Sequence, residues 1–210
     1  MKFLNYKLYH GTSDIFLDSI KKYGLGLRDP ELFDKNLLIN LATEISSHKK
    51  TSQYWQGHEY IINKMIAEEG RYKYQGIYFS ASQYTAKRYG SKNFGSEYIA
   101  TIHDLYQNLK LINSSRAYQI IKDNYKLKKL FKIENKPILI TWNRAPIDDY
   151  LGTETGFGVE HVKQQICSMD ELVKDFPNES DIVLQQYNFI CKKIIPYKQI
   201  KFEYFSPIAQ

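Results

Sequence analysis

The stretch Gly76-Ile77-Tyr78-Phe79-Ser80, followed by Ala86 and Tyr89, carries most of the information about this chain's fold. Its five residues predict a short apolar strand that carries an aromatic side chain. Ser82 is of the residue type that caps helix N-termini, so a short helix should follow and end near Tyr89. The stretch therefore predicts a strand that turns directly into a helix.

An earlier segment, Leu8-Tyr9-His10-Gly11-Thr12, predicts the same local structure. A strand over 6–9 should end at His10, and Ser13 or Asp14 should cap the helix that follows. Each segment then delivers a polar or aromatic group to the end of a strand, which is where ligand-contacting side chains are often held.

The rest of the chain predicts a mixture of helices and strands without repeats or a low-complexity linker. We expect helices over 28–70, 97–132 (split at 113–115) and 159–175, strands over 76–80, 136–142, 187–191 and 200–205, and a loop over 144–160. This order predicts an α+β fold: a split, largely antiparallel sheet with flanking helices and a helical insertion. We interpret 1–210 as a single domain with helical embellishments at 28–70 and 97–132.

Composition limits the classes of partner and the compartment that we expect for the chain. Its 210 residues carry a net charge of +6, which permits a nucleic-acid partner without requiring one. Only two cysteines are present, and they suit a reducing, cytoplasmic compartment. No segment approaches the ~20 apolar residues that span a bilayer, and the first seven residues do not form a Sec signal, so no membrane partner is expected. Secretion by a route without such a signal stays open.

Together the two segments resemble the halves of the NAD-binding site in ADP-ribosyltransferases. The similarity is to the His-Tyr-(Glu) branch, which includes the poly(ADP-ribose) polymerases and diphtheria-toxin-like enzymes. It rests on Tyr9-His10-Gly11-Thr12 and, further along, on Gly76, Ile77, Tyr78, Phe79, Ala86 and Tyr89, with eleven residues from the first tyrosine to the second. The resemblance implies an ADP-ribosyltransferase-like fold that uses NAD+ as a substrate.

The resemblance also implies a role for each residue of the two motifs. Tyr78 and Tyr89 would sandwich the nicotinamide ring, and His10 would hold a ribose hydroxyl from the opposite wall of the same pocket. The main chain at Gly11 would bond the carboxamide, because a glycine lets a flat ligand approach the backbone closely. Thr12 and Ser80 complete the expected NAD-binding set. We expect His10 and Tyr78 within about 10 Å of each other, which is the size of the ligand portion between them.

The chain departs from this family at the third motif. The family has a Glu there, on a late strand, that stabilises the positive charge developing at the ribose C1′. The Pro196 turn best places Asn188 at this position, with Gln186 two residues before it and Gln185 as a further candidate. Strand alternation would put Gln186, Asn188 and Ile190 on one face, with Asn188 pointing into the cleft of His10 and Tyr78.

Three interpretations of this departure stay open. The acceptor or another carboxylate could supply the missing charge, the chain could be an inactivated Glu→Gln form of an active enzyme, or it could be a natural NAD or ADP-ribose binder without catalysis. Glu154 and Glu160 are candidates for a substitute carboxylate, although solvated loop positions explain them as well. Arg144 could meet a pyrophosphate, or be solvated on the surface.

The function that the sequence favours is a mono-ADP-ribosyltransferase, a bacterial or phage-related toxin or effector. Its acceptor would be a nucleic acid or a protein, and a neutralising antitoxin is a further expected partner. The basic run 122–132 predicts either a solvated helix face or an electrostatic track for a phosphate backbone or an acidic partner. The five histidines never pair at metal-ligand spacing, so no metal is expected. The alternative is a catalytically silent NAD- or ADP-ribose-binding module.

Overall fold

The structure of the chain is a computed structural model. It describes residues 2–26, 35–48, 76–112, 115–122, 124, 128–129, 131–132, 134–147, 151–153 and 156–208. The chain divides into two compact units, each discontinuous in sequence. The first combines 1–27, 76–96 and 135–210, and the second combines 28–75 and 97–134. The segments expected to embellish a single domain therefore pack as a unit of their own.

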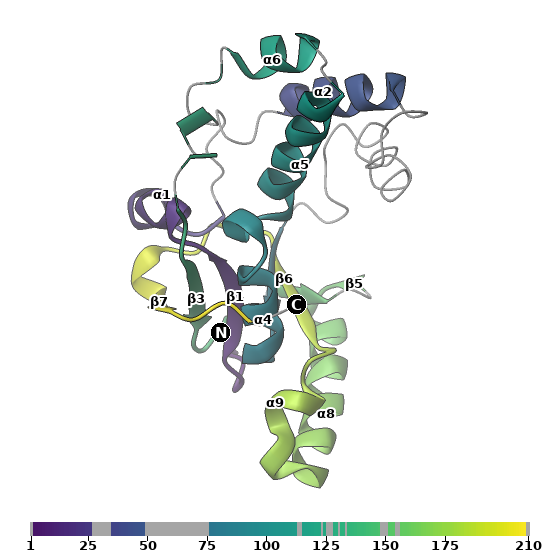
Figure 1. Cartoon of the computed structure of the whole chain (residues 1–210). Coiled ribbons are helices and arrows are strands. Elements are labelled where there is room, and N and C mark those ends of the chain that lie inside the picture. The colour runs from purple at the N-terminus through teal and green to yellow at the C-terminus, as the bar shows by residue number, and fades with distance from the viewer. Residues whose placement is uncertain are drawn as a thin grey trace. The chain divides into compact units, whose positions relative to one another are not determined.

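The first unit is built on a seven-stranded sheet in which every neighbouring pair of strands is antiparallel (Figure 1). In spatial order the strands are β5 (Gly156–Phe157), β4 (Leu151–Thr153), β6 (Asn188–Cys191), β2 (Ile77–Ser80), β1 (Leu8–Ser13), β3 (Pro137–Trp142) and β7 (Ile200–Tyr204). The predicted α+β class with an antiparallel sheet is confirmed.

Strand β1 is held very differently on its two sides. Toward β3 all six of its residues are aligned, from Leu8 opposite Trp142 to Ser13 opposite Pro137. Toward β2, Tyr9 opposite Ser80 is the single aligned pair, although both strands lie wholly within the described residues. We call this side, where β1 and β2 share one pair, the open flank of β1.

The two faces of the sheet are covered by different helices. One face carries the main buried cluster, in which Leu8, Phe79 and Trp142 pack with residues of α1 (Leu17–Tyr23) and α8 (Val159–Asp175). The other face is covered by α4 (Gln83–Gly90), which packs along β1 and β3. Three-residue 3-10 helices complete the unit: η1 (Asp14–Phe16), η2 (Asn93–Gly95), η3 (Pro177–Glu179) and η4 (Tyr197–Gln199), together with the short helix α9 (Ser180–Val183).

The helix ends in this unit follow the sequence signals. The Ser13 hydroxyl accepts a hydrogen bond from the Ile15 N–H at 3.4 Å and so caps η1, which leads into α1. Gly24 ends α1 with φ +89°, a conformation that favours glycine. The Ser82 hydroxyl accepts from the Thr85 N–H at 3.2 Å and caps α4. The predicted caps at Ser13 and Ser82 are confirmed.

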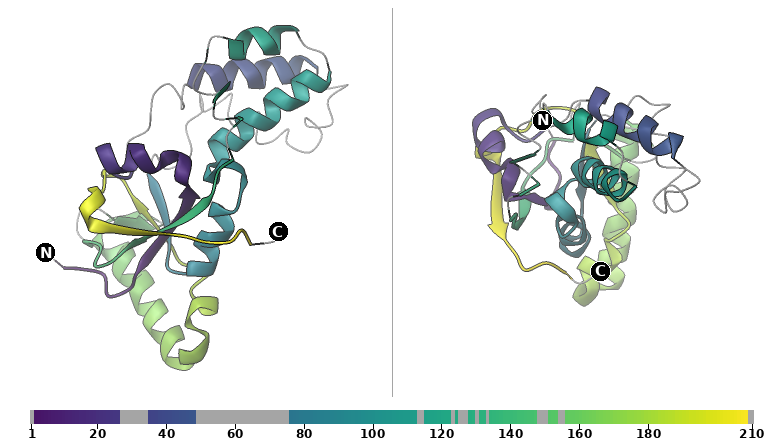
Figure 2. Two further views of the ribbon diagram at one scale, coloured as in Figure 1. Left: turned by 60° about the vertical axis from the view of Figure 1, so that its left-hand side comes forward. Right: turned by 45° about the horizontal axis from the view of Figure 1, so that its top comes forward.

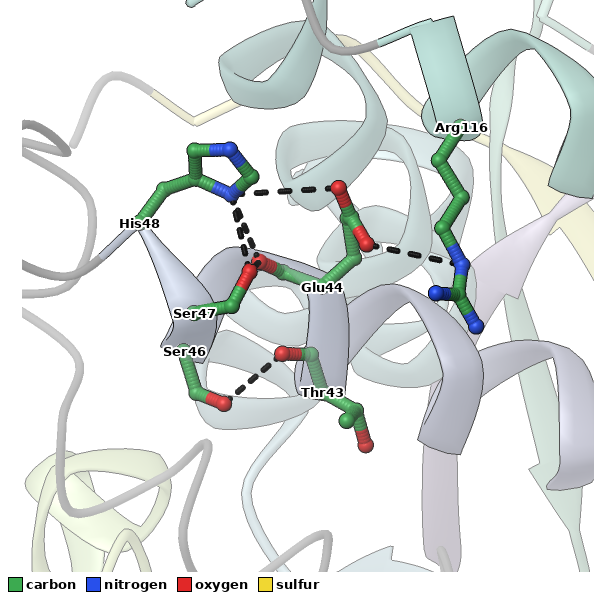
Figure 3. A network of polar contacts seen from close by, with 6 residues as sticks. All are labelled: Thr43, Glu44, Ser46, Ser47, His48 and Arg116. Atoms are coloured by element: carbon green, nitrogen blue, oxygen red, sulfur yellow. Dashed lines mark hydrogen bonds and ion pairs between the residues drawn. The ribbon is translucent and has the colours of Figure 1, made fainter.

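The second unit contains three described helices, α2 (Lys35–Ser47), α5 (Glu97–Leu111) and α6 (Ser115–Lys122), which pack side by side (Figure 2). The C-terminal end of α2 is capped by side chains: the Ser47 hydroxyl donates to the carbonyl oxygen of Glu44 at 2.7 Å, and His48 Nδ1 lies 3.0 Å from the same oxygen (Figure 3). The Glu44 carboxylate meets Arg116 Nε at 3.6 Å and so ties α6 to α2. Most of the predicted 28–70 insertion lies outside the described residues.

Three sequence predictions about strands need correction. Strand β1 runs through Ser13, so His10 lies in its middle and not at its end, because pairing with β3 continues past Gly11. The expected loop over 144–160 contains β4 and β5, and β4 extends the sheet by pairing with β6. Strand β6 begins at Asn188, because Leu184–Gln186 form a turn after α9, so Gln186 takes no part in strand alternation.

In the part of the chain that the structure describes, every helix is too short or too polar to cross a membrane.

Candidate functional site

The three motif segments meet on neighbouring strands of the first unit. Tyr9 of β1 lies opposite Ser80 of β2, and Ser80 lies opposite Asn188 of β6. Because paired residues of an antiparallel ladder put their side chains on the same face, these three side chains form one row across the sheet. Tyr78, two residues from Ser80, shares that face. The segments that resemble the transferase motifs are therefore brought together by β2, the strand between the other two.

His10 reaches β2 across the open flank. Its Nδ1 atom lies 2.7 Å from the main-chain carbonyl oxygen of Tyr78. A carbonyl oxygen can only accept, so Nδ1 carries the proton and the neutral ring has its lone pair on Nε2. Burial lowers the pKa of His10, and the bond to the Tyr78 carbonyl opposes that shift. His10 is thus held as a neutral imidazole that can accept a hydrogen bond through Nε2.

The expected closeness of His10 and Tyr78 is confirmed, although their side chains leave the sheet on opposite faces. Alternation along β1 places Tyr9 on the face of Ser80, Tyr78 and Asn188, and His10 on the other. On that other face the His10 ring lies 5.7 Å from the ring of Phe79. Asn188 therefore shares a face of the sheet with Tyr78 and not with His10, and its place in one cleft with both stays a prediction.

Gly11 is required by packing against α4. A Cβ atom at Gly11 would lie 1.8 Å from the carbonyl oxygen of Ala86 and 2.6 Å from the amide nitrogen of Gly90. The missing side chain lets helix and strand approach until a Cβ on Gly90 would meet the Cα of Gly11 at 3.1 Å. The space that we expected a flat ligand to use is filled by the backbone of α4. Binding of a carboxamide by the Gly11 main chain stays a prediction.

The hydroxyls of Thr12 and Ser80 bond within the protein. Both residues are buried. Thr12 Oγ1 donates to the carbonyl oxygen of Gly95 at 3.0 Å, while Ser80 Oγ accepts from the Ser82 N–H at 3.1 Å, at the turn into α4. These bonds fix the loop after α4 against β1 and shape the strand-to-helix turn. Contact of either hydroxyl with NAD stays a prediction.

Tyr78 and Tyr89 both present their rings to solvent. Tyr78 is 37% exposed and Tyr89 is 52% exposed, far above the core aromatics such as Phe79 at 1%. The Lys92 ammonium lies 4.6 Å from the centre of the Tyr89 ring. Tyr78 leaves the sheet on the face that α4 covers, and Tyr89 belongs to α4. Tyr78 thus points to the face of the sheet on which α4, the helix of Tyr89, packs. The action of the two rings as a sandwich stays a prediction.

The third-motif candidates lie in different environments. Asn188 is half-buried at the start of β6, where its carbonyl oxygen accepts a hydrogen bond from Gln165 Nε2 of α8 at 2.9 Å. Gln186 is exposed in the turn before the strand, and Gln185 is half-buried with its carbonyl oxygen 3.4 Å from Thr85 Oγ1. Asn188 alone of these three lies on a strand within the sheet.

The auxiliary charged candidates are engaged elsewhere. The Glu160 carboxylate, in the first turn of α8, accepts from Lys163 Nζ at 2.6 Å, and this bond lowers the pKa of Glu160. The Arg144 guanidinium lies 5.0 Å from the centre of the Phe3 ring. Glu154 lies outside the described residues. Among the residues that the structure describes, no group of three His, Cys, Asp or Glu side chains could hold a metal ion.

Asp181 of α9 is a functional candidate that sequence reasoning missed. Its Oδ1 accepts from the Gln83 N–H at 2.6 Å and its Oδ2 from the Tyr84 N–H at 3.1 Å, so one carboxylate caps α4 from another helix. Together with burial, Asp181 and Glu203 raise the pKa of Tyr9, which lies in the row with Ser80 and Asn188. Asp181 and Gln83 are 98 residues apart, so no local sequence pattern predicts this cap.

Comparisons with models of protein families, with curated proteins and with solved structures find no match to this chain.

Proposed function

We propose that the chain is an NAD+-dependent mono-ADP-ribosyltransferase, a bacterial or phage-related toxin or effector that acts on a nucleic-acid or protein acceptor. One observation carries the proposal: His10 Nδ1 lies 2.7 Å from the main-chain carbonyl oxygen of Tyr78 at the open flank of β1, although the two motifs are 68 residues apart. The antiparallel α+β sheet, which places Asn188 opposite Ser80, supports it further. The specific ADP-ribosyltransferase fold belongs to this proposal.

The residues present fit NAD+ as a substrate in a defined way. Tyr78 and Tyr89 offer exposed rings for the nicotinamide, and neutral His10 offers Nε2 to a ribose hydroxyl. Because the side chains of His10 and Tyr78 leave the sheet on opposite faces, a ligand that contacts both has to lie across the open flank of β1. That geometry explains why β1 and β2 would share a single aligned pair at this point.

The reaction breaks the bond between the nicotinamide nitrogen and the ribose C1′. The bonding electron pair leaves with nicotinamide, positive charge develops on the ribose, and the acceptor attacks C1′ and loses its proton. Tyr78 and Tyr89 would hold the leaving group, and His10 would fix the ribose. Asn188 can hydrogen-bond a ribose hydroxyl but carries no charge, so its support of the cationic transition state is weaker than that of a carboxylate.

Asn188, which carries no charge, also favours a second function. If no other carboxylate reaches the ribose, the chain binds NAD or ADP-ribose without turnover. Asp181 binds the N-terminus of α4 and Glu160 pairs with Lys163, so a role for either carboxylate at the ribose would require it to leave its present partner. Glu154, which lies outside the described residues, and the acceptor itself remain as sources of the missing charge. The two functions share a binding site and differ in chemistry at Asn188.

The deciding experiment measures nicotinamide release from NAD+ by the parent chain and by Asn188→Glu, Gln186→Glu and Gln185→Glu. Asn188→Glu should raise turnover by one to a few orders of magnitude, since ~1.4 kcal/mol of transition-state stabilisation gives tenfold. Gln186→Glu should leave it unchanged, because Gln186 lies in the exposed turn. The matched control is Gln164→Glu, an exposed position on α8 that adds the same charge.

Each outcome of this series selects between the functions. Activation by Gln186→Glu or Gln185→Glu alone would move the third motif away from Asn188. Tight NAD binding with no turnover in any variant would support the silent module. Absence of NAD binding in calorimetry, in the parent chain and in Asn188→Glu alike, would overturn both.

A further inference from the structure

The positive charge of the chain is concentrated in one segment of the second unit. Residues 110–132 contain seven basic side chains and one acidic one, a net charge of +6 that equals the charge of all 210 residues. The remainder of the chain therefore sums to zero. Six of the seven basic residues lie in the described part, and all six are exposed: Lys110, Arg116, Lys122, Lys128, Lys129 and Lys132. We call these six the basic segment.

The fold gathers the basic segment around α5 and α6. Phe131 packs between two residues of α5: its ring lies 5.0 Å from the His103 ring, edge on, and 6.0 Å from the Tyr106 ring, stacked. The Lys110 ammonium lies 5.5 Å from the centre of the same Tyr106 ring. Lys132 directly follows Phe131. Lys110 and Phe131, the residue before Lys132, therefore both lie against the Tyr106 ring.

Local contacts organise the middle of the segment. The buried side chain of Ile121 anchors α6, which leaves Lys122 at the exposed end of that helix. The Lys128 ammonium donates to the carbonyl oxygen of Lys122 and satisfies a carbonyl group at the helix end. The bond holds the Lys128 side chain at the end of α6, where the exposed Lys122 also lies.

Few acids in the described part of the unit offset this charge. Glu44 pairs with Arg116, and Asp104 lies 3.3 Å from His103 Nδ1. Glu134 follows the segment as an exposed residue. None of these carboxylates is recorded within ion-pair distance of a lysine of the basic segment, among the residues that the structure describes.

We propose that the basic segment binds the phosphate backbone of a nucleic acid. A polyphosphate strand carries a charge at every nucleotide, so it can neutralise lysines spread over α5, α6 and the following residues at once. An acidic protein would have to supply six carboxylates in a matching arrangement. The aromatic stack beside Lys110 and Lys132 also favours nucleic acid, because base stacking on aromatic rings accompanies phosphate contacts in strand-binding proteins. This binding is a function beyond NAD chemistry and does not depend on it.

The test measures binding of fluorescein-labelled oligonucleotides by anisotropy, without NAD, from about 50 to 200 mM salt, the range over which phosphate contacts lose most affinity. Single-stranded DNA, single-stranded RNA and a DNA duplex form three arms that identify the source of the phosphates. The variant is Lys122→Gln with Lys129→Gln and Lys132→Gln. The matched control is Lys7→Gln with Lys174→Gln and Lys198→Gln, three exposed lysines of the first unit. Each triple lowers the net charge from +6 to +3.

The segment variant should bind single strands on the order of 100-fold more weakly near 0.1 M salt, and its slope of log affinity against log salt should fall by about 2, because three phosphate contacts at ~0.7 ions each are lost. The control should change affinity by no more than about threefold, since screening limits distant charges. Replacing the same three lysines by Arg should preserve binding. That result would show that the Gln variant binds more weakly because it has lost charge.

Three results would overturn the proposal. Equal weakening by both triples would mean that net charge alone attracts the ligand. Competition by poly-glutamate as strong as that by an oligonucleotide of equal charge would identify an acidic protein as the partner. Affinity that does not fall with salt would exclude phosphate contacts by lysine.

Discussion

The two sides of β1 show how one strand can be both a fixed part of a sheet and the border of a site. Toward β3 it is aligned over its full length, while toward β2 it shares the pair Tyr9–Ser80 and the Tyr78 carbonyl is met by an imidazole. Pairing with β3 sets the position of β1, and the backbone of α4 packs closely against it at Gly11. Full pairing on one side thus leaves the other side of β1 available to border the proposed site.

The largest expected effect comes from removing the close approach of α4 to β1. Gly11→Ala would place a Cβ atom 1.8 Å from the Ala86 carbonyl oxygen, so the helix backbone has to move. We expect a loss of about 3 kcal/mol in the free energy of unfolding, the upper part of the usual range for overpacking. Urea denaturation measures it. Gly90→Ala is the control with milder contacts of 3.0 to 3.1 Å, and equal losses in both variants would contradict this account.

Substitutions of Tyr89 and Tyr78 test whether NAD binds at the open flank. Tyr89→Ala should weaken NAD binding by about 1–3 kcal/mol, by analogy with the stacking of bases on aromatic rings. Tyr78→Phe should cost less, about 1 kcal/mol, because it removes one hydroxyl and keeps the ring. Calorimetry gives both affinities. Unchanged affinity in Tyr89→Ala would remove the sandwich from the proposed site.

The next effect concerns the helix that supports the open flank. Asp181→Ala leaves the Gln83 and Tyr84 amides at the start of α4 without their carboxylate, and should lower the free energy of unfolding by about 1–2 kcal/mol. Denaturant midpoints report the change. Glu171→Ala, at an exposed position on α8, is the matched control and should be close to neutral. A neutral Asp181→Ala would show that α4 needs no cap from α9.

The smallest expected effect is a pH dependence of the free energy of unfolding that comes from His10. Burial lowers the pKa of His10 in the folded chain below 6.5, so the unfolded chain takes up its proton first as the pH falls. Stability should therefore decrease as the pH drops below about 6.5, with a slope of at most ~1.4 kcal/mol per pH unit from this group, and the decrease should stop below the folded pKa. Denaturation between pH 7 and 5 measures it.

His10→Gln should reduce this slope, because an amide can donate to the Tyr78 carbonyl without titrating. His161→Gln, at an exposed position on α8, should leave the slope as it is. The same reduction in both variants would mean that the pH dependence does not come from the open flank.

The sequence by itself determined the local elements around the site. Ser13 and Ser82 cap their helices through hydrogen bonds within a few residues, and a run of apolar residues made β3 recognisable, so these features need no knowledge of distant segments. The sequence also placed Asn188 on a strand, and its resemblance to the transferases predicted that His10 lies near Tyr78.

The tertiary structure decided what depends on register and on long-range partners. That His10 and Tyr78 leave the sheet on opposite faces follows from the alignment of Tyr9 with Ser80, and a shift of one residue would reverse it. Gly11 serves helix packing because α4 folds back on β1, and Asp181 caps α4 across 98 residues. Alternation, capping by a serine next to the helix and apolar periodicity act over a few residues and can be predicted along the chain. Strand register and the choice of packing partner depend on the whole core at once.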